Sequence, residues 1–377
     1  MRIAVLAHVR HPVAAPFRGG MEALTWQLAR GLGARGHEVV LFASGDSDRR
    51  FALDPVLAEH HERGFPGAEH RGDRALVAHL DAGHAAALDR IAAGGFDVLH
   101  NNGLSRLAIE RRRTARVATV TSLHVPPYDA LRWFVHDSPA PAHRITVTSR
   151  AQLGAWWPDG EPPEASVLHN GVDPAAWPFR ATGAGAVWSG RIAPEKGPHL
   201  ASAAARRAGA ALTLFGPVED PGYWEARVAP ALGGAIRYGG HLDAAALAGE
   251  VGRAAICLFT PLWDEPFGLA AVEAMACGVP VAAFDAGAAR EVVGEAGAFA
   301  PPGDAAGLAA AIERAALIPR TEPRDRVLRL FTRDLWLDRC EDLYAQARAG
   351  LAGRTLDAGR DVTAGGREDG TRAGGRA

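Results

Sequence analysis

The fold is decided near the start of the chain by residues 3–43, IAVLAHVRHPVAAPFRGGMEALTWQLARGLGARGHEVVLFA. Ile3–Ala7 is a short apolar run followed by a loop, which is typical of a buried parallel strand. Met21–Ala34 carries leucines at intervals of four residues, so it is predicted to be a helix with one apolar face. Glu38–Ala43 is the next predicted strand. Strand, glycine loop, helix and strand in this order open a doubly wound α/β domain.

Outside this opening unit, strands and helices continue to alternate in both halves of the chain. Short apolar runs predict further strands at Val98–His100, Val117–Ser122, Ile145–Thr148, Ala186–Trp188, Ala211–Phe215 and Val279–Phe284. Helices are expected at about His199–Ala208, Ala244–Val251 and Leu269–Cys277. The polar, histidine-rich segment Phe51–Asp73 is predicted to be a loop or an insertion.

The chain is long enough, at 377 residues, for two domains of ordinary size. A proline- and acid-rich stretch near its middle marks the division. We expect one Rossmann-like domain over residues 1–165 and a second over residues 166–332. Residues 333–350 are predicted to form a final helix, with Leu335, Trp336, Cys340, Leu343 and Tyr344 on one side. Residues 351–377 contain almost nothing apolar and are expected to be a disordered tail.

Composition narrows the class of protein. Apolar residues make up 48% of the chain, charged residues make up 22%, and the net charge is -2. This balance argues against nucleic acid as the main partner, because binders of a phosphate backbone usually carry excess positive charge. The cysteines, three in number and widely spaced, indicate neither disulfides nor a zinc site. No signal peptide or membrane-spanning helix is predicted, so we expect a cytoplasmic protein and leave peripheral membrane contact open.

Two cations follow a predicted strand in the segment SGRIAPEKG, residues 189–197. Ligands of open α/β sheets gather at the carboxyl ends of the strands. There, the fork of Arg191 and the compact charge of Lys196 could bind a diphosphate. The alternative is a solvated surface pair with Glu195 as its partner.

A second segment, residues 264–280, has the sequence DEPFGLAAVEAMACGVP. Glu265 lies in a loop and Gly268 opens a helix, whose first N–H groups can hold an anion. Glu273 follows on the same helix, among largely apolar neighbours. A carboxylate in such surroundings needs a partner, which a ligand hydroxyl could supply. The alternative is that both glutamates are ordinary surface acids.

Taken in order, these motifs resemble the family 4 retaining glycosyltransferases of the GT-B fold. The resemblance rests on Gly19-Gly20-Met-Glu22, the segment RGHEV at residues 35–39, Asn170-Gly-Val-Asp173, the cations at 191 and 196, and two glutamates separated by seven residues. It covers the chain up to about Ala352. It implies two Rossmann-like domains that face each other across a cleft, with the final helix crossing back onto the first domain.

The resemblance also implies a role for each matching residue. Arg191 and Lys196 would bind the donor diphosphate and stabilise charge on the leaving group. Glu265 would lie near the transferred sugar, and Glu273 would bind the ribose hydroxyls. Further donor contacts would come from Gly19, Gly20 and the backbone amides of Phe267, Gly268 and Leu269. The segment YGGHL at residues 238–242 would border the base.

Two histidines follow predicted strands of the first domain. His124, in the segment TSLHVPP, matches a family histidine close to the donor sugar, although Val-Pro-Pro departs from the small residues that are frequent after it. The alternative is a strand-end histidine bonded to a backbone carbonyl. His100 is a second candidate, for the acceptor side.

The pair Asp46 and Asp48 has the spacing of a metal site in the other major glycosyltransferase fold. We reject that interpretation, because the pair belongs to the first domain and the cations already supply positive charge. No metal and no cofactor are therefore expected.

The predicted function is transfer of a sugar, with retention at the anomeric carbon, from a UDP- or GDP-type donor to a glycan, lipid or small-molecule acceptor. The rival interpretations are an epimerase or phosphorylase of the same fold, a non-catalytic nucleotide-sugar binder, and a nicotinamide-dependent oxidoreductase. The oxidoreductase is disfavoured because the loop at Gly19 is not GxGxxG. The sequence does not specify the acceptor or the oligomeric state.

Overall fold

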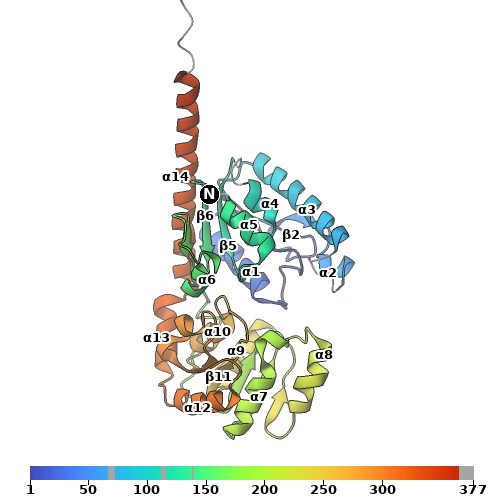
Figure 1. Cartoon of the computed structure of the whole chain (residues 1–377), viewed down its shortest axis with the longest axis vertical. Coiled ribbons are helices and arrows are strands. Elements are labelled where there is room, and N and C mark those ends of the chain that lie inside the picture. The colour runs from blue at the N-terminus through green and yellow to red at the C-terminus, as the bar shows by residue number, and fades with distance from the viewer. Residues whose placement is uncertain (67–72, 112–115, 138–139, 365–377) are drawn as a thin grey trace, which may run out of the picture.

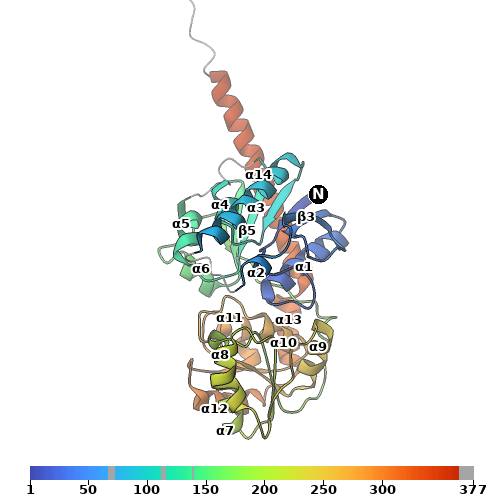
Figure 2. The same cartoon turned by 90° about the vertical axis from the view of Figure 1, so that its right-hand side faces the viewer.

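The computed structural model describes residues 1–66, 73–111, 116–137 and 140–364. Within these residues, seven parallel strands form one sheet in the order β3-β2-β1-β4-β5-β6-β7, and six form a second in the order β10-β9-β8-β11-β12-β13. The two sheets lie in separate lobes, one above the other in Figures 1 and 2. The predicted fold class, α/β with two Rossmann-like domains, is confirmed.

The strands of the first sheet are β1 (Arg2–Leu6), β2 (Glu38–Ser44), β3 (Ala52–Leu57), β4 (Val98–Asn101), β5 (Ala118–Leu123), β6 (His143–Val147) and β7 (Ala165–Val167). Those of the second are β8 (Ala186–Ser189), β9 (Leu212–Phe215), β10 (Ile236–Tyr238), β11 (Ile256–Phe259), β12 (Val281–Phe284) and β13 (Gly297–Ala300). All pairings are parallel, as a sheet with helical crossovers requires.

The helices of the first lobe are α1 (Gly20–Ala34), α2 (His61–Gly64), α3 (Arg74–Ala93), α4 (Arg106–Glu110), α5 (Asp129–Asp137) and α6 (Arg150–Trp156). Those of the second are α7 (Pro198–Arg207), α8 (Pro221–Tyr223), α9 (Ala244–Arg253), α10 (Leu269–Ala276), α11 (Ala289–Val293), α12 (Ala305–Ala315) and α13 (Thr321–Leu330), and α14 (Arg333–Ala364) ends the described chain. None of the helices in the described ranges combines the length and apolarity needed to cross a bilayer.

The side chains of β1 point alternately to the two faces of the first sheet, which explains why both faces are covered by helices. Ile3 and Val5 belong to a core shared with α1 and α14, whereas Ala4 and Leu6 belong to a core shared with α3. Successive side chains of a strand point to opposite faces, so a continuously apolar strand needs a helical layer on each side. The second sheet follows the same rule, with α9 and α10 on one face and α7 and α12 on the other.

The final helix, α14, belongs to the first lobe although it follows the second in sequence. Its buried side chains, Trp336, Leu337, Cys340, Leu343, Tyr344 and Ala347, lie in the same core as β1 and α1. Gly31 of α1 allows this close approach, because a Cβ there would lie 2.6 Å from Leu337 Cδ1. Figure 1 shows α14 running alongside the first lobe.

Three boundaries differ from the sequence prediction. Residues 52–57 form strand β3 rather than a loop, because Val56 and Leu57 are buried and Pro55 is tolerated on an edge strand. The division after residue 165 falls inside β7, which pairs with β6. The final helix continues to Ala364, because adding a residue to a formed helix gains a backbone hydrogen bond without new nucleation. Residues 365–377 of the predicted tail lie outside the described residues.

Candidate active site

The predicted donor residues lie on two loops at the carboxyl edge of the second sheet. Arg191 follows β8 and Lys196 ends a short 3-10 turn, Pro194–Lys196, while Glu265 follows β11. Gly268 begins α10 with a φ of +94°, and a Cβ there would lie 2.6 Å from the ring of Phe259. Glycine is therefore required at this turn for both its backbone angle and its size.

Lys196 and Glu265, 69 residues apart in sequence, form the centre of the site. Lys196 Nζ lies 2.5 Å from Glu265 Oε2, and the two side chains are 19% and 11% exposed. Trp263 holds both residues: its Nε1 donates to Glu265 Oε2 at 2.7 Å, and its ring centroid lies 4.7 Å from Lys196 Nζ. The pairing joins the two motifs that the sequence analysis singled out separately.

Arg191 lies in a charged network that reaches the first lobe. It donates to Glu219 and, at 3.2 Å, to Glu195. Arg10, which follows β1, lies 3.8 Å from the other oxygen of Glu219 and pairs with Glu62 at 3.1 Å. Glu219 therefore neutralises one cation from each lobe. The predicted partner Glu195 is present, but it is not the only carboxylate on Arg191.

The glycine loop meets the second lobe directly. A Cβ on Gly20 would lie 3.1 Å from Leu269 Cδ1, and one on Gly19 would lie 3.1 Å from Glu22 Oε2. Glu22 is buried, with His8 Nδ1 at 3.5 Å from its Oε1. Burial raises the pKa of Glu22, while a backbone hydrogen bond and the positive charges of Arg191 and Arg10 oppose that shift. The loop thus brings a carboxyl group towards Arg191.

His124 is half-buried just beyond the end of β5. Its Nε2 donates to Asn102 Oδ1 at 3.2 Å, because an amide oxygen can only accept. Burial lowers the pKa of His124 to about 4, so the ring is neutral near pH 7. The alternative of a histidine bonded to a backbone carbonyl does not describe this contact.

His100 does not line the site. It is fully buried, with Nδ1 2.6 Å from the hydroxyl of Tyr344 on α14 and Nε2 3.0 Å from Ser122 Oγ. The predicted role of His100 in shaping the acceptor side stays a prediction, and full burial means that any such role would act through its neighbours. As a residue of a central strand, it faces the layer that α14 covers, and the sequence near His100 contains nothing that indicates this contact.

Glu273 lies on α10 beside the buried thiols of Cys257 and Cys277. Burial raises its pKa to about 8. Within the described part of the chain, no side-chain hydrogen bond or ion pair to Glu273 is found, so it differs from Glu265, which is paired. The ring of Phe267 is buried with its centroid 5.6 Å from that of Phe331, and this contact anchors the loop that leads into α10.

The other residues that the sequence singled out, Tyr238, Asp46 and Asp48, each have their own hydrogen-bond partners. Tyr238 donates from its hydroxyl to the carbonyl of Gly216 at 2.7 Å, next to the end of β9. Asp46 is bonded to His60, and Asp48 to Arg50 and to Trp26 Nε1 at 2.9 Å. In the described ranges, no group of three or more acidic, cysteine or histidine residues has metal-binding geometry. The two aspartates are bound to first-lobe partners and are not among the contacts of Arg191 or Lys196.

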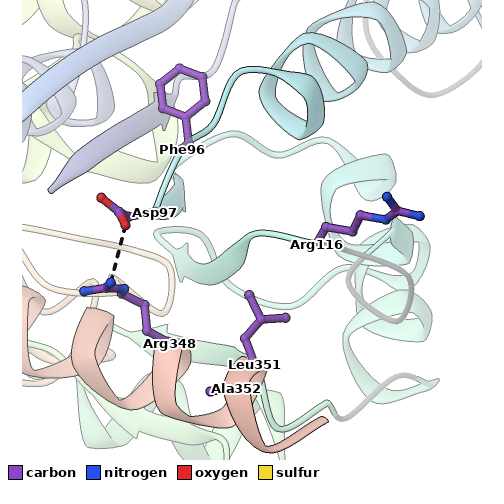
Figure 3. Close-up of a pocket in the computed structure, with 6 residues that line it drawn as sticks. All are labelled: Phe96, Asp97, Arg116, Arg348, Leu351 and Ala352. Carbon is purple, nitrogen blue, oxygen red and sulfur yellow. Dashed lines mark ion pairs between the residues drawn. The ribbon is translucent and has the colours of Figure 1, made fainter. Parts of the chain in front are cut away.

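A pocket of about 310 Å³ lies beside α14, and Figure 3 shows the residues that line it. It is lined by Phe96, Asp97, Arg116, Arg348, Leu351 and Ala352, and Arg348 lies 3.4 Å from Asp97 across it. None of the predicted site residues lines it. The sequence analysis missed Arg10, Glu219 and Trp263 in the site; the only local signal is that Trp263 stands two residues before Glu265.

Family models and relatives among known proteins match both lobes of the chain. Residues 18–176 match the model of Glycosyltransferase Family 4, and residues 184–316 match that of Glycosyl transferases group 1. A phosphatidyl-myo-inositol mannosyltransferase of Mycolicibacterium smegmatis is 29% identical over 337 residues, which is 83% of this chain and 84% of the relative. A glycogen synthase of Mycobacterium tuberculosis is 39% identical over 163 residues, and the match spans only 39% of its length and 40% of this chain.

Two solved structures share the arrangement of both lobes. Sucrose-phosphate synthase from Thermosynechococcus elongatus has a TM-score of 0.76 at 22% identity, over 93% of this chain and 100% of that one. The Anabaena protein HepE, solved with UDP-glucose, has a TM-score of 0.70 at 16% identity, over 92% and 99% of the two chains. These likenesses confirm the fold.

Two parallel-sheet lobes, together with the family models that match them, identify a glycosyltransferase of the GT-B architecture. The two family models together extend over both lobes. The chain belongs to glycosyltransferase family 4.

Proposed function

We propose that this protein transfers a sugar from a nucleoside diphosphate donor to an acceptor hydroxyl, with retention at the anomeric carbon. The observation that carries the proposal is the Lys196–Glu265 contact, with Arg191 on the same edge of the sheet. One site then offers two cations for a diphosphate and a carboxylate for sugar hydroxyls. HepE binds UDP-glucose, which favours a UDP-type donor.

In the proposed complex, the diphosphate takes the place of carboxylates on the two cations. Arg191 would leave Glu219 or Glu195, and Lys196 would leave Glu265. Glu265 is then available to accept hydrogen bonds from the sugar, while Trp263 Nε1 still holds its Oε2. Glu273 accepts from the ribose hydroxyls, which gives its otherwise unpaired carboxyl a partner.

The chemical step breaks the bond between the anomeric carbon and the phosphate oxygen. The acceptor oxygen bonds to the same face of that carbon, and its proton passes to the departing phosphate. Arg191 and Lys196 stabilise the charge that develops on the leaving group, so no metal ion is needed in this proposal. His124, neutral near pH 7, lies on the first-lobe side and orients the sugar.

A donor screen tests the proposal. The protein is mixed with UDP- and GDP-sugars, and its melting temperature and slow donor hydrolysis are followed for each. At least one donor is expected to raise the melting temperature, because a ligand that binds only the folded state stabilises it. That donor should also be hydrolysed slowly, and the Lys196→Ala variant should lose both effects. If no nucleotide sugar is bound or hydrolysed, the proposal is wrong.

A further inference from the structure

Gln152, on α6 of the first lobe, bonds to the backbone carbonyls of both residues that flank His124. Its side chain is buried, and its Nε2 donates to the carbonyl of Leu123 at 2.9 Å and to that of Val125 at 2.7 Å. Both donor hydrogens of the amide are therefore used on either side of a single residue. This fixes the backbone on both sides of His124, whose ring makes the contact with Asn102.

The other end of Gln152 reaches towards the donor loop. Its Oε1 accepts from the backbone N–H of Thr148 at 2.7 Å and also lies 2.7 Å from Thr148 Oγ1. The same hydroxyl lies 2.8 Å from the carbonyl of Pro266, the residue after Glu265. With one proton, the hydroxyl can donate to only one of these oxygens at a time. The contact with Pro266 spans 118 residues of sequence and joins the two lobes.

A second contact between the lobes, made by the carboxylate of Glu291, lies near this point. Glu291 of α11 accepts from the backbone N–H groups of Arg150 and Ala151, at 2.9 and 3.3 Å, where α6 begins. It also accepts from His169 Nε2 at 2.8 Å. The start of α6 is therefore fixed to the second lobe, and Gln152, two residues after Arg150, is held in register with the donor loop.

We propose that Gln152 is a positioning residue that sets His124 opposite Glu265, with Thr148 linking it to the donor loop. The inference rests on the proposed function, because it assumes that His124 and Glu265 act on one donor sugar. Its physical basis is that a catalytic group misplaced by about 1 Å can cost about 100-fold in rate. Neither Gln152 nor Thr148 needs to touch the substrate.

The test compares Gln152→Met, which keeps the volume and removes the amide, with Gly154→Ala on the same helix. A Cβ on Gly154 would have nothing within 4 Å, so this variant controls for changes to α6. Gln152→Met is expected to lower kcat about 100-fold, with KM for the donor and Kd for UDP changed less than about twofold. Gly154→Ala should behave as wild type. An unchanged kcat in Gln152→Met would overturn the inference.

A double-mutant cycle separates positioning from a general loss of structure. If Gln152 acts through His124, Gln152→Met should lower kcat no further in the His124→Ala background. Fully additive losses would overturn the inference. Should Gln152→Met fail to fold, the hydroxyl link is tested instead: Thr148→Ser should retain kcat and Thr148→Val should lose it. Equal kcat values in that pair would also overturn the inference.

A spectroscopic readout keeps this inference distinct from the proposed function. The NMR signal of the His124 ring can be assigned by its absence in the His124→Gln variant. This signal should shift in Gln152→Met and stay unchanged in Gly154→Ala. If wild type transfers no sugar but the signal shifts, the proposed function fails and the positioning contact stands. If wild type transfers sugar and the signal does not shift, the positioning inference fails alone.

Discussion

Replacing Glu265 with glutamine should have opposite effects on nucleotide binding and on sugar transfer. In the ligand-free protein, Glu265 competes with the diphosphate for Lys196, since Nζ and Oε2 are 2.5 Å apart. Glutamine keeps the shape and can still accept from Trp263 Nε1, but it carries no charge to hold the lysine. The variant should therefore bind UDP more tightly and transfer sugar more slowly.

The magnitude follows from the exposure of the pair. A hydrogen bond between charged groups contributes about 1.5–3 kcal/mol, and exposed ion pairs contribute about 0.2–1 kcal/mol. With side chains 19% and 11% exposed, Lys196 and Glu265 fall between these cases. Loss of the competing carboxylate should make the binding free energy of UDP more favourable by about 1 kcal/mol, which corresponds to a Kd about fivefold lower. Loss of its contact with the sugar should lower kcat about 100-fold.

The assay is calorimetric titration with UDP, together with initial rates on the donor found by the screen. Asp264→Asn is the matched control, because it removes one negative charge from the exposed neighbour of Glu265. It should change both quantities less than twofold. Weaker UDP binding in Glu265→Gln than in Asp264→Asn would refute the competition argument. A normal transfer rate in Glu265→Gln would refute the assignment of Glu265 to the sugar.

Further outcomes follow from the other site residues. Arg191→Ala should weaken UDP binding by about 1.5–3 kcal/mol, and an unchanged Kd by calorimetry would contradict its role. His124→Ala should lower turnover more than donor affinity, and Glu273→Ala should do the reverse; a normal rate in His124→Ala would remove that histidine from the mechanism. Transfer should survive excess chelator, and a loss that magnesium or manganese restores would show that a metal is needed. Burial raises the pKa of the Glu273 carboxyl from 4.5 to about 8, so the folded protein binds the carboxyl proton more tightly than the unfolded chain does. As the pH rises from 4.5 to 8, the folded state therefore loses up to about 1.4 kcal/mol of stability per pH unit. Glu273→Gln should therefore melt progressively higher than wild type as pH rises from 5 to 8, and a constant difference in melting temperature would contradict the shift.

Local sequence patterns determined much of the fold. Apolar runs placed β1, β4 and β5 to within about two residues, because a strand covered on both faces must be apolar throughout. The histidine-rich segment after Phe51 was misjudged, because an edge strand such as β3 is only half-buried and tolerates Pro55. Residues 351–364 of the predicted tail were misjudged because their polar composition hid the continuation of α14.

The sequence also determined which residues carry charge at the strand ends, but only the tertiary structure decided their partners. Arg191, Lys196 and Glu265 were singled out from their positions after strands. That Lys196 faces Glu265, that Arg10 shares Glu219 with Arg191, and that Gln152 holds the His124 loop depend on contacts between distant segments. Secondary-structure periodicity is a local property of the chain. The Lys196–Glu265 pair, 69 residues apart, is set by the strand order that makes β8 and β11 neighbours in one sheet. The hydrogen bond from Thr148 to the Pro266 carbonyl, 118 residues apart, is set by how the loops of the two lobes meet.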